Sequence, residues 1–163
     1  MPATKHIRQQ IREKVQTTLT GLTTTGANVF MTRNNPLSED EGELPGLLIG
    51  SDPQTPTIDR VVQRSQGCAA AGIRRANQRT MRLPVRGYHK VVASLENVLD
   101  TVAKEVEVAM FADPLLGGVA FELRLMDTTI TTDGSGDKPV GMVEMNFEVD
   151  YWCVEGAPDV VTN

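Results

Sequence analysis

Four oxygen-bearing residues in the C-terminal third have the spacing of a calcium-binding loop. Asp133, Ser135 and Asp137 stand at positions 1, 3 and 5 of such a loop, and Glu144 stands at position 12. Lys138 occupies the sixth position, where the sharp turn favours glycine, and the flanking sequences indicate strands rather than helices. Because glycine and aspartate are also the usual residues of a hairpin turn, the sequence favours a turn and leaves ion binding open.

The groups that most often perform catalysis do not form a recognisable constellation. His6 and His89 are the two histidines and Cys68 and Cys153 the two cysteines, and their spacing fits neither zinc nor a histidine-activated nucleophile. The glycine-rich residues 134–138 lack the spacing of a phosphate-binding loop. We therefore expect no catalytic residue, no cofactor, no metal ligand set and no enzymatic activity.

Half of the basic charge lies in one fifth of the chain. Residues 60–90 contain no acidic residue and eight basic ones, namely Arg60, Arg64, Arg74, Arg75, Arg79, Arg82, Arg86 and Lys90. Residues 91–163 contain three basic and fourteen acidic residues, so the net charge of -5 hides two opposed blocks. Such asymmetry bears on partners and association rather than on fold.

Three roles for this basic segment are open. Its arginines suit planar pairing with the acidic block, either within the subunit or across an interface between subunits. They also suit contact with a nucleic-acid backbone, although Tyr88 is the only aromatic residue nearby. The third role is a plain solvated surface.

The two opposed blocks favour head-to-tail association. A positive surface of one copy would meet a negative surface of the next, and a ring would form if the rotation closes. On this hypothesis, replacing Arg79, Arg82 and Arg86 by Glu is expected to impair assembly while leaving the helices intact.

The remaining composition is that of one globular domain. The chain has 163 residues, of which 40% are hydrophobic and only 4% aromatic, so we expect an aliphatic core in a single domain over residues 1–154. No apolar run approaches the length of a membrane span, and no membrane partner is expected. The two distant cysteines make no disulfide framework, which favours a reducing compartment.

Two helices are predicted from apolar periodicity. Between Thr4, a capping residue, and Gly21, apolar residues recur every fourth position over residues 7–19. Residues 94–111 follow the i, i+3, i+4, i+7 pattern, with Ser94 as the capping residue.

Strands are predicted at residues 27–31, 44–49, 80–85, 119–125 and 143–151. Pro84 places the third of these at an edge or a bulge, and turn residues 132–139 join the last two into a hairpin. Residues 51–72 are expected to form a long loop or arm, and residues 155–163 a flexible tail. The element order predicts an α+β fold, with a mainly antiparallel sheet and two helices on one face.

This arrangement resembles the tail terminator proteins of long-tailed bacteriophages, also called tail completion or minor tail proteins. The likeness rests on the order of the elements: the amphipathic helix, the segments 29–30 and 44–49, the strand and helix over residues 80–111, and the run 139–151 with its short tail. It covers most of the chain without a unique motif. Residues 51–72 depart from it, because they are longer than a compact member of the family needs.

The resemblance implies a structural, non-enzymatic protein of the virion tail or neck, assembled in the host cytoplasm. Such proteins form a ring, typically six-fold, that caps the tail tube, ends its polymerisation and offers the surface on which the head docks. The implied partners are further copies of the chain, the tail tube protein and a head-completion or connector protein. DNA would pass through the bore of the ring.

Other classes stay open beside this one. Another neck component, such as a head–tail connector or stopper, shares the size and the ring symmetry. A tail-tube subunit is disfavoured by the two helices. A small DNA-binding α+β protein would use the arginines of residues 60–90, and a small enzyme of unassigned chemistry is the last alternative.

Overall fold

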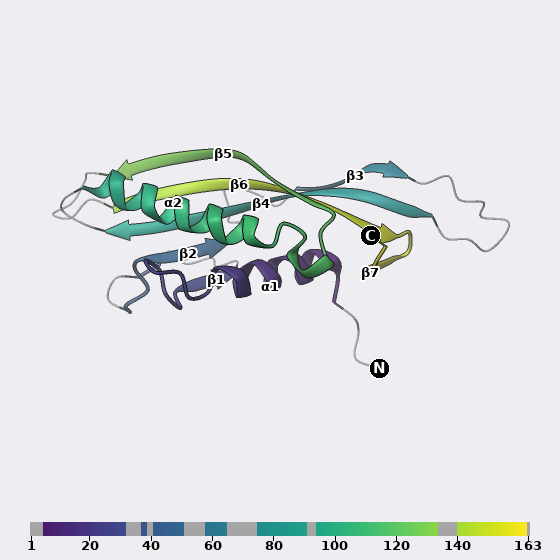
Figure 1. The fold of residues 1–163 in the computed structure, drawn as a ribbon, viewed down its shortest axis with the longest axis horizontal. Helices are drawn as coiled ribbons and strands as arrows, with labels where there is room; N and C mark the ends of the chain where they lie inside the picture. Colours follow the sequence, from purple (N-terminus) through teal and green to yellow (C-terminus); the bar gives the residue numbers. More distant parts are fainter. Residues whose placement is uncertain are drawn as a thin grey trace.

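The computed structural model describes residues 5–31, 37–38, 41–50, 58–64, 75–90, 94–133 and 140–162. These residues fold into an α+β structure with one seven-stranded sheet (Figure 1). In chain order the elements are α1 (Ile7–Leu19), β1 (Val29–Met31), β2 (Gly46–Ile49), β3 (Asp59–Arg64), β4 (Ala76–Lys90), α2 (Leu95–Ala112), the 3-10 helix η2 (Leu116–Gly118), β5 (Glu122–Asp133), β6 (Val140–Val154) and β7 (Ala157–Val161).

Strands β4 and β6 form the centre of the sheet. They are antiparallel and pair along their whole length of 15 residues each, from Ala76 opposite Val154 to Lys90 opposite Val140. β2 and β3 share the other edge of β4, and β5 and β7 share the other edge of β6. β1 continues the sheet beyond β2 in a parallel pair. At one end of the molecule, β3 and the start of β4 project beyond both helices (Figure 1).

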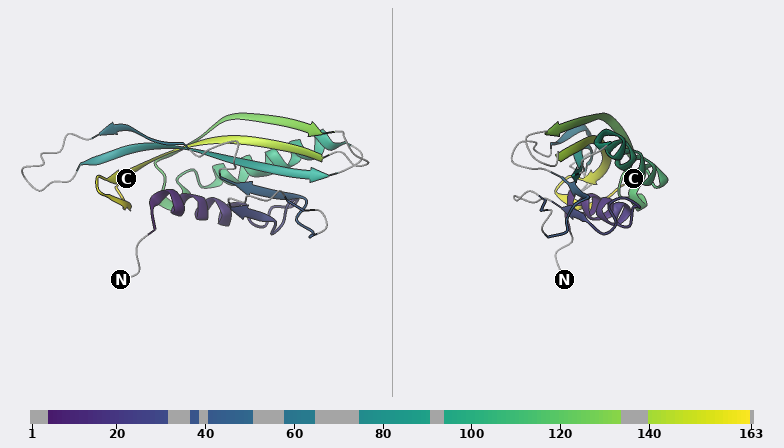
Figure 2. Two further views of the ribbon diagram at one scale, coloured as in Figure 1. Left: turned by 180° about the vertical axis from the view of Figure 1, so that it is seen from behind. Right: turned by 90° about the vertical axis from the view of Figure 1, so that its left-hand side faces the viewer.

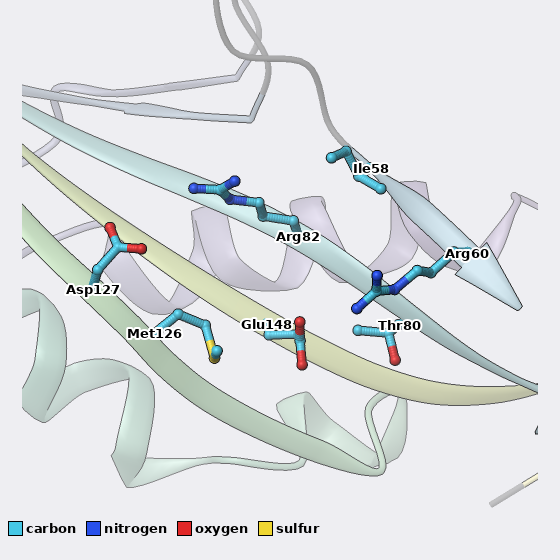
Figure 3. Close-up of a pocket in the computed structure, with 7 residues that line it drawn as sticks. All are labelled: Ile58, Arg60, Thr80, Arg82, Met126, Asp127 and Glu148. Atoms are coloured by element: carbon cyan, nitrogen blue, oxygen red, sulfur yellow. The ribbon is translucent and has the colours of Figure 1, made fainter. Parts of the chain in front are cut away.

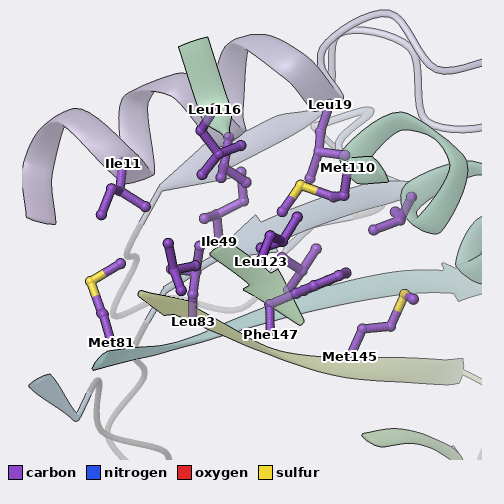
Figure 4. Packing of buried hydrophobic residues seen from close by; sticks show 14 of the residues in the cluster. Ile11, Leu19, Ile49, Met81, Leu83, Met110, Leu116, Leu123, Met145 and Phe147 are labelled. Carbon is purple, nitrogen blue, oxygen red and sulfur yellow. The ribbon is translucent and has the colours of Figure 1, made fainter. Parts of the chain in front are cut away.

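Both helices pack on the same face of the sheet (Figure 2). The buried residues of α1 form the predicted stripe, Ile7, Ile11, Val15 and Leu19. Those of α2 are Leu99, Val102, Val106 and Met110. They meet alternate residues of the central strands, such as Leu83 and Phe147, in a single hydrophobic core (Figure 4). Each large side chain buried there contributes about 1.5–3 kcal/mol, which holds the helices to the sheet.

Two glycines let α2 approach the sheet closely. A Cβ added at Gly87 would lie 2.7 Å from a methyl group of Val102, and one added at Gly141 would lie 2.6 Å from a methyl group of Leu99. Both distances are shorter than van der Waals contact, so any larger residue would push the helix outward. Glycine inside a strand commonly marks such a close approach.

The helix starts differ in detail from the sequence prediction. Thr4 lies outside the described residues, and His6 is the N-cap of α1, where its Nδ1 accepts a hydrogen bond from the amide of Arg8 at 3.1 Å. Ser94 occupies the predicted N-cap position of α2, but its side chain makes no capping hydrogen bond. The C-terminal end of α1 agrees with the sequence prediction, because Gly21, with φ of 95°, follows its last turn.

Two segments predicted to lack regular structure contain strands. The expected loop at residues 51–72 includes β3, which pairs with β4. The expected flexible tail at residues 155–163 includes β7, which pairs with the end of β6. In both places a neighbouring long strand offers unpaired backbone groups, and pairing satisfies them.

Pro84 lies in a central strand, so the prediction of an edge or a bulge is wrong. Its carbonyl accepts a hydrogen bond from the amide of Gly50 at 2.9 Å, on the side of β4 away from β6. The nitrogen of Pro84 therefore faces the gap between the end of β2 and the start of β3. Proline has no N–H to donate, but at this position the N–H would point away from β6, so no hydrogen bond between β4 and β6 is lost.

Candidate functional site

The predicted basic segment does not form one surface. Arg60 and Arg64 lie on β3, and Arg79, Arg82 and Arg86 lie on β4, with Arg75 before its start and Lys90 at its end. Arg74 lies outside the described residues. Because each strand residue adds about 3.3 Å, β4 alone is roughly 50 Å long. Successive side chains also alternate between the two faces of the sheet. Length and alternation together divide the basic segment into separate environments.

Arg86 is buried inside the chain. It is 1% exposed, and its Nε donates a hydrogen bond to the carboxylate of Glu144, which lies opposite it on β6. Its Nη1 lies 3.4 Å from the carbonyl oxygen of Gly50. Arg86 therefore pairs within the subunit, one of the alternatives that the sequence left open, and it is not a surface residue for a partner or DNA.

Arg79 is also engaged within the chain. Its Nη1 donates to Oδ2 of Asp59 at 3.1 Å, and the hydroxyl of Tyr151 donates to the same oxygen at 3.0 Å. Burial and the nearby carboxylate of Asp59 raise the pKa of Tyr151, so its hydroxyl remains a donor at neutral pH. This cluster holds β3 against β4 and β6, and its role is structural.

The face of the sheet opposite the helices carries charges of both signs. Arg124 on β5 lies 2.7 Å from Glu148 and 3.0 Å from Asp150, and its hydrogen bonds to these carboxylates raise the pKa of its guanidinium. Arg82 is exposed, lies opposite Glu148 in the register, and donates from Nε to Asn146 at 3.3 Å. Charges on this face are therefore largely paired within the chain.

A shallow pocket of about 270 Å³ opens on this face (Figure 3). It is lined by Ile58, Arg60, Thr80, Arg82, Met126, Asp127 and Glu148. Its two arginines face two carboxylates, so the pocket carries no net positive charge. A phosphate backbone would gain little there, which weakens the case for this face as a nucleic-acid interface.

The most exposed part of the basic segment is β3. Every side chain from Arg60 to Arg64 is exposed, and Val61 and Val62 are 39% and 58% exposed. A bulge between Val61 and Gln63 leaves Val62 out of the register with β4. Arg60 and Arg64 make no ion pair with another described residue. Arg60 lies opposite Thr80 and Arg64 opposite Asn77, so the two arginines point to opposite faces of β3. We call Val61, Val62 and Arg64 the β3 surface, which is basic and aliphatic.

A groove of opposite charge lies between α2 and β5. It has a volume of about 570 Å³ and is lined by Asp100, Ala103, Lys104, Glu107, Val108, Phe111 and Thr128. Val108 is 65% exposed and Phe111 is 42% exposed. The helix carries four acidic residues and one basic residue. We call these seven residues the α2–β5 groove, which is acidic and apolar.

Sequence reasoning found the charges of these two surfaces and missed their apolar residues. Val61 and Val62 stand in a segment whose proline and serine neighbours indicate a loop, and a loop predicts neither burial nor exposure for them. Val108 and Phe111 lie three residues apart on α2, outside its buried stripe. The sequence alone therefore contains a signal for this exposed apolar surface, namely a second apolar pair outside the buried stripe of an acidic helix.

The calcium-like spacing receives no support from the described residues. The side chains of Asp133, Ser135 and Asp137 lie outside them, and Glu144 is engaged by Arg86. Among the described residues, no group of three or more His, Cys, Asp or Glu side chains is placed to hold a metal ion. None of the described helices is long and apolar enough to cross a membrane.

No protein-family model matches the chain, and no curated protein matches it.

Proposed function

We propose that this chain is a structural subunit of a bacteriophage tail, which associates head to tail into a ring. One observation carries the proposal: the β3 surface is basic and apolar, the α2–β5 groove is acidic and apolar, and they belong to different parts of the molecule. A contact between two different surfaces repeats from copy to copy, and it closes into a ring when the rotations complete a full turn.

The biological role comes from the resemblance to tail terminator proteins. In that role the ring, typically six-fold in the family, caps the tail tube, ends its polymerisation and receives the head. The proposed location is the tail or neck of the virion. The proposed partners are the tail tube protein, a head-completion or connector protein and, in the bore, genomic DNA.

Electron microscopy and mass measurement test this proposal together. The purified protein is imaged alone and after mixing with tail tubes, and its mass in solution is measured over a range of protein and salt concentrations. We expect rings that weaken as salt rises, because salt screens charge pairing at exposed surfaces. We also expect one ring at one end of each tube. If the protein is monomeric at every concentration and does not bind the tubes, the proposal is wrong.

Another neck component is the nearest alternative. A connector or stopper would form a ring of similar size but would attach to filled heads rather than to tube ends. The same microscopy distinguishes the two, if isolated heads are included as a second target.

A DNA-binding role is the second candidate, and the exposure of Arg60, Arg64 and Arg75 favours it. Isolated monomers should then shift duplex DNA in a gel, and the shift should fade with rising salt because counterions compete for the phosphates. A ring without DNA affinity would favour the structural role.

A further inference from the structure

We infer that the outer edge of β5 pairs with the same edge of a second copy, in an antiparallel ladder centred on Ile130. This contact joins identical surfaces through a two-fold axis, so it closes after two copies. It goes beyond the proposed function and does not depend on it, because a head-to-tail contact joins unlike surfaces.

The outer edge of β5 is open in the part of the chain that the structure describes. β5 pairs with β6 on one side and stands last in the strand order of the sheet, along its margin (Figure 1). Every side chain from Met126 to Thr132 is exposed. This edge therefore presents a row of backbone N–H and C=O groups to which a further strand can bind.

The features that usually protect a sheet edge are missing from this one. Edge strands are commonly blunted by charged side chains, by proline or by a bulge. Residues 128–132 are Thr, Thr, Ile, Thr and Thr, and the bulge of β5 lies before them, between Leu125 and Asp127. From Asp127 to Asp133 the pairing with β6 continues without a shift, so this part of the edge is regular.

The sequence of this edge favours a second copy of the chain as its partner. Residues 127–133 read the same in both directions about Ile130, as Asp-Thr-Thr-Ile-Thr-Thr-Asp. In an antiparallel ladder centred there, Ile130 lies opposite Ile130 of the second copy, and Thr129 lies opposite Thr131. Pairs of threonines and pairs of β-branched residues are favourable neighbours across strands. An unrelated strand would match this row only by coincidence, whereas a second copy matches it by symmetry.

The two aspartates set the ends of the contact. Asp127 of one copy would lie opposite Asp133 of the other, and like charges in opposite positions weaken a ladder. Salt screens such repulsion, so pairing through β5 should strengthen as the salt concentration rises. A head-to-tail contact between opposite charges should weaken under the same conditions, so the two kinds of contact are distinguishable.

Cysteine cross-linking tests the register of the ladder. Residues directly opposite each other in an antiparallel pair have Cα atoms about 4.5–5.5 Å apart, a distance that a disulfide can span. In a Cys68→Ser background, Ile130→Cys should therefore form a covalent dimer under mild oxidation, while the native Cys153 is buried. Thr129→Cys alone should not, because its counterpart in the second copy would lie roughly 8 Å away. Thr129→Cys mixed with Thr131→Cys should form the dimer.

Lysine substitution tests the same contact without cysteine. Thr129 and Thr131 face away from α2, because they alternate with Ile130, which lies opposite the core residue Val143. Thr129→Lys together with Thr131→Lys would place like charges opposite each other beside the two-fold axis. The dimer should then dissociate at least about 100-fold more readily, as measured by analytical ultracentrifugation.

Two further variants control this result. Thr17→Lys together with Thr23→Lys makes the same change of charge at two exposed threonines outside β5, and this variant should dimerise as the unmodified chain does. Asp133→Asn should tighten the dimer about tenfold, because it removes the like charges at both ends of the ladder. Circular dichroism confirms that all variants fold.

These experiments separate this inference from the proposed function. If Ile130→Cys forms no covalent dimer, or if Thr129→Cys alone forms one as readily, the β5 pairing is wrong, whereas rings at tube ends would leave the proposed function standing. If the expected cross-links form and the protein never binds tubes, the β5 pairing holds and the tail role is wrong.

Discussion

The carboxylate of Asp59 lies 3.1 Å from Nη1 of Arg79, and the Asp59 side chain is only 3% exposed. The same oxygen accepts the hydroxyl of Tyr151 and lies 3.4 Å from Nε of Arg8. One buried anion therefore connects the start of α1 with β3, β4 and β6. It lies at the point where β3 leaves the body of the molecule, and so it fixes the direction in which the β3 surface projects.

Replacing Asp59 by Ala should lower the free energy of unfolding by about 3 kcal/mol, because Arg79 and Tyr151 would lose a shared partner. Urea denaturation followed by circular dichroism measures this. Glu13→Gln is the matched control: Glu13, on the surface of α1, pairs with Lys5, and such exposed pairs add little to stability. If the two substitutions lower the free energy of unfolding equally, the Asp59 cluster stabilises the fold no more than a surface ion pair does.

Replacing Arg86 by Ala should lower the free energy of unfolding by about 3 kcal/mol or more, because Glu144 would lose its partner and a cavity would remain. Arg82→Glu, at an exposed position of the same strand, should change it by less than about 1 kcal/mol. The joint replacement of Arg79, Arg82 and Arg86 by Glu is therefore expected to unfold the chain, and it is no test of an interface. A folded triple variant would contradict the burial of Arg86.

Gly141→Ala should lower the free energy of unfolding by about 1–3 kcal/mol, because its Cβ would meet Leu99 and Leu95 at less than contact distance. Leu99→Ala in the same chain would make room for that methyl group. The double variant should then lose less stability than the two single losses added together. Strict additivity would show that α2 does not approach β6 as closely as described.

His6 should make the stability of α1 depend on pH. Burial and the neighbouring Arg8 lower the pKa of His6 below its ordinary value, so the folded chain favours the neutral imidazole that accepts the Arg8 amide. The stabilisation is complete above about pH 6.5 and is lost as pH falls through the lowered pKa, because the unfolded chain then binds the proton more readily. Urea denaturation at several pH values between 7 and 5 measures this loss.

His6→Asn keeps an N-cap acceptor that does not titrate, so its stability should fall less over the same pH range. His89→Gln, on β4, serves as the control and should retain the pH dependence of the unmodified chain. If His6→Asn keeps the pH dependence of stability and His89→Gln loses it, a group other than His6 causes that dependence.

The sequence predicts the helices well, because their apolar periodicity extends over many residues. It predicts the final hairpin only in part, because β6 covers the expected 143–151 whereas the strand expected at 119–125 runs from Glu122 to Asp133. Ile7, Ile11, Val15 and Leu19 are all buried, as the stripe predicts. It predicts β3 and β7 poorly, because each is short and lies among prolines, glycines or polar residues. β4 is far longer than residues 80–85, since pairing with β6 extends it in both directions.

The candidate site could be predicted only in part. A count of charges identifies residues 60–90 as basic, yet it cannot tell that Arg86 lies opposite Glu144 while Arg60 remains exposed. That distinction depends on strand register, which is set by pairing between distant segments. The bulge at Val62 and the groove beside α2 likewise arise from tertiary packing rather than from local pattern.

The pairing of β4 with β6 also governs when the sheet can form during synthesis. Ala76 finds its partner in Val154 and Lys90 finds its partner in Val140, so the central ladder joins segments separated by α2 and β5. Contacts of such long range form slowly. On a ribosome, β4 must wait for β6 to be synthesised before it acquires that neighbour. We therefore expect Asp59 and Arg79 to be fixed in place only after translation of β6, which supplies Tyr151, the other donor to Asp59.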